Sequence, residues 1–140
     1  MRIELIEKDI EAEFASCQDW FDKYDLLIRM GRESPGLDDT HRVDANAIPG
    51  CQSNVWLKAS VTDGRLSLQA DSDALITKGI LSLLIRVYND QYPQDVLDAR
   101  LEFLDTIGLT TNLSPSRSDG LSSIIRRIRE IAAKSLAEGS

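Results

Sequence analysis

The chain has 140 residues, of which 42% are hydrophobic and 28% are charged, as in an ordinary soluble globular protein. A net charge of −7 argues against a general nucleic-acid binder, because phosphate affinity depends on Lys and Arg side chains. The acidic N-terminal stretch and the shortness of every apolar run argue against an export signal, a transit peptide and a membrane span. We therefore expect a single cytoplasmic domain over residues 1–140, whose partners are proteins or small molecules.

Two amphipathic helices are predicted in the first 31 residues. Apolar side chains recur at helical spacing from Glu4 to about Cys17, so Cys17 falls on an apolar face and is expected in the core. A second helix begins near Trp20, and Gly31 suits its C-terminal cap. The short break between them predicts two antiparallel helices joined by a tight turn.

Residues 32–50 predict a long irregular connection, because they combine proline, glycine and scattered acids. A connection of this length is uncommon in a compact domain unless it has a function. It leads directly to Cys51, in the stretch "IPGCQSNVW" at 48–56. This region is therefore the first place to look for a site.

A β-hairpin is predicted over residues 54–71, where apolar and polar residues alternate around an Asp63-Gly64 turn signal. Val55 and Leu57 belong to one face of the first strand. Trp56 belongs to the other face, where it is either covered by a second layer or exposed for a partner.

Helices follow the hairpin. Asp71, Ser72 and Asp73 are capping candidates for a core helix that runs to about Asn89. Two short helices are predicted in "YPQDVLDA" and "LEFLDTIGL", the second ended by Gly108.

The segment "SPSRSDG" at 114–120 is typical of a turn, and an amphipathic helix is predicted from Leu121 onward. Its outward side chains include Arg126, Arg127 and Arg129, which suit a solvated face. The whole order of elements predicts an α+β fold with a small antiparallel sheet covered on one face by helices.

Cys51 is the main candidate for chemistry, although many free cysteines are simply small buried hydrophobes. Gly50 and Pro49 can hold its thiol at a loop apex. A reactive thiol needs a positive neighbour or hydrogen-bond donors, for which Arg117 and His41 are the candidates. Arg117 is otherwise a turn arginine or a helix cap, and His41 a solvated loop residue.

The sequence offers few residues for other kinds of chemistry. His41 and Cys51 indicate a hydrolase pair only weakly, because both lie in one connection without a family motif. Two Cys and one His are too few for a closed metal site, so no metal is expected. A Cys17–Cys51 disulfide is disfavoured in a chain without an export signal. A thiol redox enzyme, in which Cys17 resolves a sulfenic acid on Cys51, remains an alternative.

Four segments together resemble the SufE family of sulfur-acceptor proteins, and the resemblance extends from about Trp20 to the C-terminal helix. They are "GCQSNVW" at 50–56, "DSDALITKGILSLL" at 71–84, "PQD" at 93–95 and "LTTNLSPSRSDGL" at 109–121. The resemblance implies a fold shared with the IscU scaffold proteins. The paralogous CsdE proteins share this architecture.

The resemblance also implies a function. Cys51 would accept persulfide sulfur from a SufS-like cysteine desulfurase, stimulate that enzyme, and pass the sulfur to a downstream SufBCD-like scaffold for iron-sulfur cluster assembly. The chain would be an accessory protein, often a homodimer, and would hold no cofactor, because the pyridoxal phosphate belongs to the desulfurase. Arg117 matches a family arginine near the acceptor loop, and Asp73 matches a position where the helix start packs near that loop. Residues 42–51 are expected to move, shielding Cys51 in the free protein and extending it into the partner.

Overall fold

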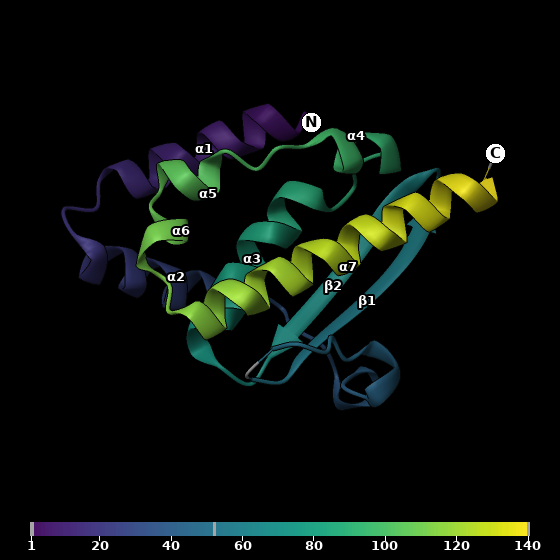
Figure 1. The fold of residues 1–140 in the computed structure, drawn as a ribbon, viewed down its shortest axis with the longest axis horizontal. Coiled ribbons are helices and arrows are strands. Elements are labelled where there is room, and N and C mark those ends of the chain that lie inside the picture. The colour runs from purple at the N-terminus through teal and green to yellow at the C-terminus, as the bar shows by residue number, and fades with distance from the viewer. Residues whose placement is uncertain (1, 52, 140) are drawn as a thin grey trace.

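The structure is a computed structural model that describes residues 2–51 and 53–139. In chain order its elements are α1 (Ile3–Ala15), α2 (Trp20–Glu33), β1 (Val55–Thr62), β2 (Arg65–Ser72), α3 (Leu75–Tyr88), α4 (Pro93–Asp98), α5 (Phe103–Thr106), α6 (Leu109–Asn112) and α7 (Pro115–Gly139). The predicted α+β class is confirmed (Figure 1). Among the described residues, no helix is both long enough and apolar enough to cross a membrane.

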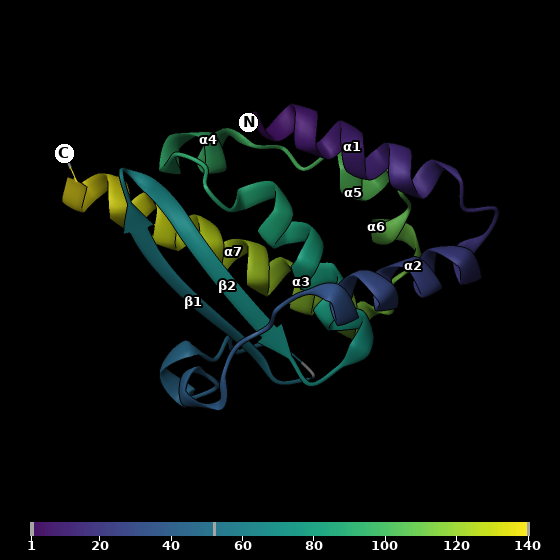
Figure 2. The same cartoon turned by 180° about the vertical axis from the view of Figure 1, so that it is seen from behind.

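The predicted hairpin is confirmed and forms the sheet layer of the molecule. β1 and β2 pair antiparallel with Val55 opposite Ser72. Asp63 and Gly64 connect the strands with positive φ angles of 54° and 79°, the conformation that a two-residue hairpin turn requires. Helices α3 and α7 lie on one face of the hairpin, as Figures 1 and 2 show from opposite sides, and Leu66 and Leu68 are buried against them.

Helix α3 is the centre of the core. Its apolar residues Ile80, Leu83, Leu84 and Val87 are almost fully buried, since α1, α2, β2 and α7 all pack against it. The first two helices run in opposite directions, as predicted (Figure 1).

The predicted capping role of Gly31 is wrong, because α2 continues to Glu33. Gly31 instead lets α2 approach α3 closely. A Cβ at Gly31 would lie 2.7 Å from the backbone nitrogen of Gly79, and a Cβ at Gly79 would lie 2.2 Å from the carbonyl oxygen of Leu27. Neither helix can carry a larger residue at this crossing without moving.

The predicted turn over 114–120 is also wrong, because α7 begins at Pro115. Ser114 acts as the N-cap: its Oγ accepts from the amide of Arg117 at 3.4 Å, and its carbonyl accepts from the amide of Ser118 at 2.9 Å. Serine followed by proline is a helix-start signal as much as a turn signal. The extra turns of α7 are the part of the helix that reaches Cys51.

The connection from α2 to β1 is irregular, as predicted, but it is held at several points. It contains two short 3-10 turns, Asp39–His41 and Asp44–Asn46. Ile48 is buried and donates its amide to the carbonyl of Val55 at 2.9 Å. Ala47 forms an isolated antiparallel bridge with Trp56, which is half-buried.

Candidate functional site

Cys51 lies between this connection and β1, against the N-terminal part of α7. Gly50 precedes it with a φ of +87°, a backbone conformation that favours glycine. A Cβ at Gly50 would also lie 2.8 Å from the Oγ of Ser123 on α7. Both the turn and the close approach therefore require glycine at position 50, and they bring the next residue onto the helix.

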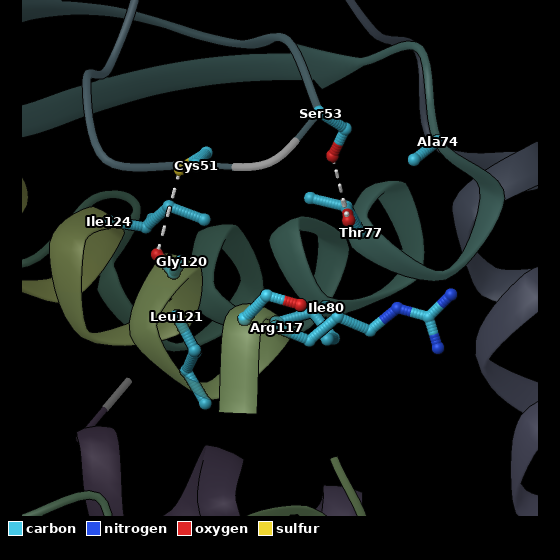
Figure 3. Close-up of a pocket in the computed structure, with 10 residues that line it drawn as sticks. Cys51, Ser53, Ala74, Thr77, Ile80, Arg117, Gly120, Leu121 and Ile124 are labelled. Atoms are coloured by element: carbon cyan, nitrogen blue, oxygen red, sulfur yellow. Dashed lines mark hydrogen bonds between the residues drawn. The ribbon is translucent and has the colours of Figure 1, made fainter. Parts of the chain in front are cut away.

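The thiol of Cys51 faces a glycine of α7. Its Sγ lies 3.8 Å from the carbonyl oxygen of Gly120, within reach of a weak S–H···O hydrogen bond (Figure 3). A Cβ at Gly120 would lie 3.7 Å from the same sulfur and 3.9 Å from the Cα of Cys51. Gly120 thus leaves open the space that a side chain of α7 would fill beside the thiol.

A cavity of about 190 Å³ opens next to Cys51, between the start of α3 and the start of α7. Ile80, Leu121 and Ile124 give it an apolar wall, and Ser53 and Thr77 add hydroxyl groups (Figure 3). The two hydroxyl oxygens lie 3.4 Å apart. The space beside the sulfur is therefore mostly apolar, although Ser116 and Arg117 of α7 also line it.

Burial raises the pKa of the Cys51 thiol above its ordinary value. The charged thiolate loses hydration in this half-buried position, and no cation among the described residues compensates for the loss. The neutral thiol can donate to the Gly120 carbonyl, whereas a thiolate would face that carbonyl's negative end. In the conformation described here, Cys51 is a protonated and weakly nucleophilic thiol at neutral pH.

Arg117 lines the same cavity, but its guanidinium points away from Cys51 and toward α2 (Figure 3). Its Nη1 donates to the hydroxyl oxygen of Tyr24 at 3.0 Å. The guanidinium is exposed and stands at the edge of the cavity rather than beside the sulfur. In this conformation Arg117 does not stabilise a thiolate, and contact with a partner stays a prediction.

Asp73 binds Asn54, the residue before β1, and does not cap α3. Its carboxylate accepts from the backbone amide of Asn54 at 3.1 Å and from the side-chain amide of Asn54 at 2.8 Å. The N-cap of α3 is Ala74, without a side-chain cap bond, so the capping role predicted for Asp73 is wrong. Ser72 accepts from the Ala74 amide instead, at 3.2 Å.

His41 and Cys17 are not brought to the thiol. The Nε2 of His41 lies 3.3 Å from the Nζ of Lys58, and His41 is not among the residues that line the cavity. Cys17 follows α1 and packs against the core, and both views place the α1–α2 connection away from the loop before β1 (Figures 1 and 2). Both cysteines are free.

No group of three or more His, Cys, Asp or Glu side chains is placed to hold a metal ion in the part of the chain that the structure describes. The residues that sequence reasoning missed are Gly120, Ser123 and Asn54. Gly120 and Asn54 lie within the quoted segments 109–121 and 50–56, but their local patterns indicate no role for either residue. Ser123 carried no local signal, since only the fold brings α7 to the loop.

Comparison with known proteins identifies the family of the chain. Residues 8–132 match the family model described as SufE, the Fe-S metabolism associated domain. The fold is similar to the solution structure of a hypothetical protein from Thermus thermophilus, with a TM-score of 0.76 and 22% sequence identity over 94% of this chain and 96% of that chain. The chain therefore belongs to the SufE family and has a role in Fe-S metabolism.

Proposed function

We propose that the protein is a sulfur acceptor that receives persulfide sulfur on Cys51 from a SufS-like cysteine desulfurase, stimulates that enzyme and delivers the sulfur to a SufBCD-like scaffold. The observation that carries the proposal is the placement of Cys51 after a glycine turn, with its thiol over a largely apolar cavity. The family supports a role in Fe-S metabolism, and this placement supports Cys51 as the residue that acts.

The transfer is a thiol exchange. The Cys51 thiolate attacks the outer sulfur of the partner's persulfide, so a new S–S bond forms on Cys51 and the bond between the partner's two sulfurs breaks. The partner's cysteine leaves as a thiolate and takes up the proton that Cys51 released. Cys51 then carries one extra sulfur at the same oxidation level, and no oxidant is required. The pyridoxal phosphate that first removes sulfur from cysteine belongs to the desulfurase.

The cavity supports storage of the transferred sulfur. A volume of about 190 Å³ has room for one further sulfur atom, because one water molecule occupies only about 30 Å³ of liquid. The walls formed by Ile80, Leu121 and Ile124 exclude water and soluble thiols from that side of the sulfur. A persulfide withdrawn into this space would be shielded until the next acceptor binds.

The raised pKa supports a two-position mechanism. A thiol that is protonated in the cavity reacts slowly, and it ionises more easily once it leaves. The movement we propose is centred on residues 49–51, and its extent depends on how firmly the preceding part of the connection, residues 36–48, is held. In that preceding part, the Arg127 side chain donates to the carbonyl of Ala47 at 3.3 Å, and the amide of Ile48 donates to the carbonyl of Val55 at 2.9 Å. Pro49 and Gly50 are exposed and lack such bonds to neighbouring elements among the bonds described.

A thiol redox enzyme is less well supported. Resolution of a sulfenic acid by Cys17 would need the two sulfurs to meet, yet the chain segments that carry them are far apart in both views (Figures 1 and 2).

Mass spectrometry tests the proposal. The protein is incubated with a SufS-type desulfurase and cysteine, and its intact mass is measured without reductant. We expect a gain of one sulfur atom that is lost in Cys51→Ser and kept in the matched variant Cys17→Ser. A wild-type protein that gains no sulfur, or gains it equally in Cys51→Ser, contradicts the proposal.

A further inference from the structure

Asp71 is a buried carboxylate at the C-terminal end of β2, with only 4% of its surface exposed. Its Oδ2 accepts from the amide of Leu37 at 3.0 Å, and its Oδ1 accepts from the amide of Ser72 at 2.8 Å. Two cations complete its surroundings: Arg42 at 3.7 Å and Lys78 at 3.5 Å. A buried carboxylate persists when its charge is paired and its lone pairs are used, and both conditions hold here.

Two of these partners lie in the connection that leads to Cys51. Leu37 and Arg42 both come from the segment between α2 and β1, which crosses the C-terminal part of β2 (Figure 2). Gly36 has a φ of +65°, and a Cβ there would lie 2.7 Å from the Oδ2 of Asp71. The backbone at Gly36 therefore lies against the carboxylate of Asp71, and the first half of the connection is fixed to β2.

The two residues after Asp71 hold the other end of the same connection. The Oγ of Ser72 donates to the carbonyl of Asn54 at 2.8 Å, and Asp73 accepts from both nitrogens of Asn54. Residues 71–73 therefore fix both the first and the last part of the chain that carries Cys51. The Asp71 contacts are separate from the cavity, because Asp71 is not among the residues that line the cavity.

We propose that Asp71 is a positioning residue for Cys51: its carboxylate fixes the start of the Cys51 connection to β2 and so keeps the thiol in the cavity beside Gly120. The importance of that placement for sulfur transfer rests on the proposed function. The placement itself does not, and it can be measured on the free protein.

The negative charge is essential to this role. An asparagine at position 71 has the same shape but offers one acceptor oxygen in place of two and presents an NH₂ group to one of the two amide donors. It also leaves Arg42 and Lys78 without their buried partner. Asp71→Asn is therefore expected to loosen the connection while filling the same volume. Asp39→Asn is the matched control, because Asp39 also pairs with Arg42 but is exposed.

The experiment measures alkylation of the free protein by iodoacetamide, with Cys51 and Cys17 followed separately by peptide mass spectrometry. We expect Asp71→Asn to raise the Cys51 rate about tenfold, equivalent to about 1.4 kcal/mol in the opening equilibrium, and to leave the Cys17 rate unchanged. Asp39→Asn should behave as the wild type at both cysteines. Cys17 serves as an internal probe, because it packs against the core and lies outside the connection.

Two results would overturn the inference. An unchanged Cys51 rate in folded Asp71→Asn would show that the carboxylate does not hold the thiol in place. An equal rise at both cysteines would show general destabilisation. If Asp71→Asn does not fold, Gly36→Ala decides, since its methyl group would displace the carboxylate from the connection side. Gly36→Ala must then raise the alkylation rate of Cys51 and leave that of Cys17 unchanged. An equal rise at both cysteines, or unchanged rates, refutes the positioning role of Asp71. The alkylation experiment contains no desulfurase, so its outcomes can be interpreted even if the sulfur-acceptor proposal fails.

Discussion

The thiol of Cys51 lies 3.8 Å from the carbonyl oxygen of Gly120, a residue 69 positions later in the chain. The contact joins the end of the irregular connection between α2 and β1 to a glycine within the long helix α7. It favours the protonated thiol, because only the neutral S–H group can donate to a carbonyl. The described conformation therefore keeps the Cys51 thiol in its less reactive, protonated form.

Gly120→Ala is expected to stabilise the protein and slow its function. Alanine raises the free energy of unfolding by up to about 1 kcal/mol through helix propensity. The added methyl would contact Cys51 at ordinary van der Waals distances, 3.7 Å from Sγ and 3.9 Å from Cα. We expect tighter packing of the loop on α7, slower alkylation of Cys51 and slower sulfur acceptance from a desulfurase. Urea unfolding and single-turnover sulfur transfer measure the two effects.

The control for this prediction is Ser122→Ala, which also improves helix propensity at an exposed position of α7. It should gain some stability without any change at Cys51. If Gly120→Ala accepts sulfur at the wild-type rate, then release of the thiol from α7 does not limit the transfer.

The pH dependence of Cys51 alkylation should show the raised pKa directly. We expect the rate to rise with a midpoint above that of an unfolded cysteine, because burial disfavours the thiolate. The folded state then holds the thiol proton more tightly than the unfolded state. This contribution to stability is full below the ordinary thiol pKa and is lost as the pH rises through the folded pKa. Cys51→Ser should lose less stability in that alkaline range. A midpoint at or below the ordinary value would contradict the buried-thiol description.

Much of this fold was readable from the sequence, for local reasons. The hairpin was predicted because alternation and the Asp63-Gly64 turn act within a few residues. Cys51 was singled out because Pro49 and Gly50 mark a loop. The start of α7 was missed because serine and proline are signals for both turns and helix caps, and only the packed helix decides between them.

The surroundings of the thiol were not readable, because they depend on contacts between distant segments. Nothing in the local sequence distinguishes the capping role expected of Asp73 from its bonds to Asn54, 19 residues earlier. Asp71 lies 34 residues from Leu37, and its burial follows from the path of the whole connection. Arg117 was expected near the sulfur, but its side chain extends to Tyr24 on α2.

Asp71 should also make the protein sensitive to acid. Burial acts to raise the pKa of Asp71, but the amides of Leu37 and Ser72 and the charge of Lys78 outweigh it and lower the pKa. Its stabilising contribution is present above the ordinary carboxyl pKa of about 3.9 and is lost as the pH falls through the lower folded pKa. Urea midpoints measured from neutral to acid pH should fall less steeply in Asp71→Asn than in the wild type. Parallel curves would show that another carboxylate controls the acid transition.

Gly50→Ala is expected to lift Cys51 off α7. Two separate effects act at this position. A left-handed conformation costs a non-glycine residue about 1 to 2 kcal/mol. The new Cβ would also lie 2.8 Å from the Oγ of Ser123, so the loop or the serine must move. We expect lower stability and faster alkylation of Cys51, measured by urea unfolding and peptide mass spectrometry.

The two effects at Gly50 can be separated with variants that the chain itself suggests. Gly64→Ala carries the same kind of strain at a φ of +79°, but its nearest neighbour is a Tyr92 carbon at 3.9 Å, so only stability should fall. Ser123→Ala removes the colliding oxygen, and in the double variant with Gly50→Ala the Cys51 rate should return toward the wild-type value while the backbone strain remains. A non-additive rate with additive stability identifies the collision as the cause. A Cys51 rate in Gly50→Ala no higher than in Gly64→Ala would show that contact with α7 at Ser123 does not hold the thiol in place.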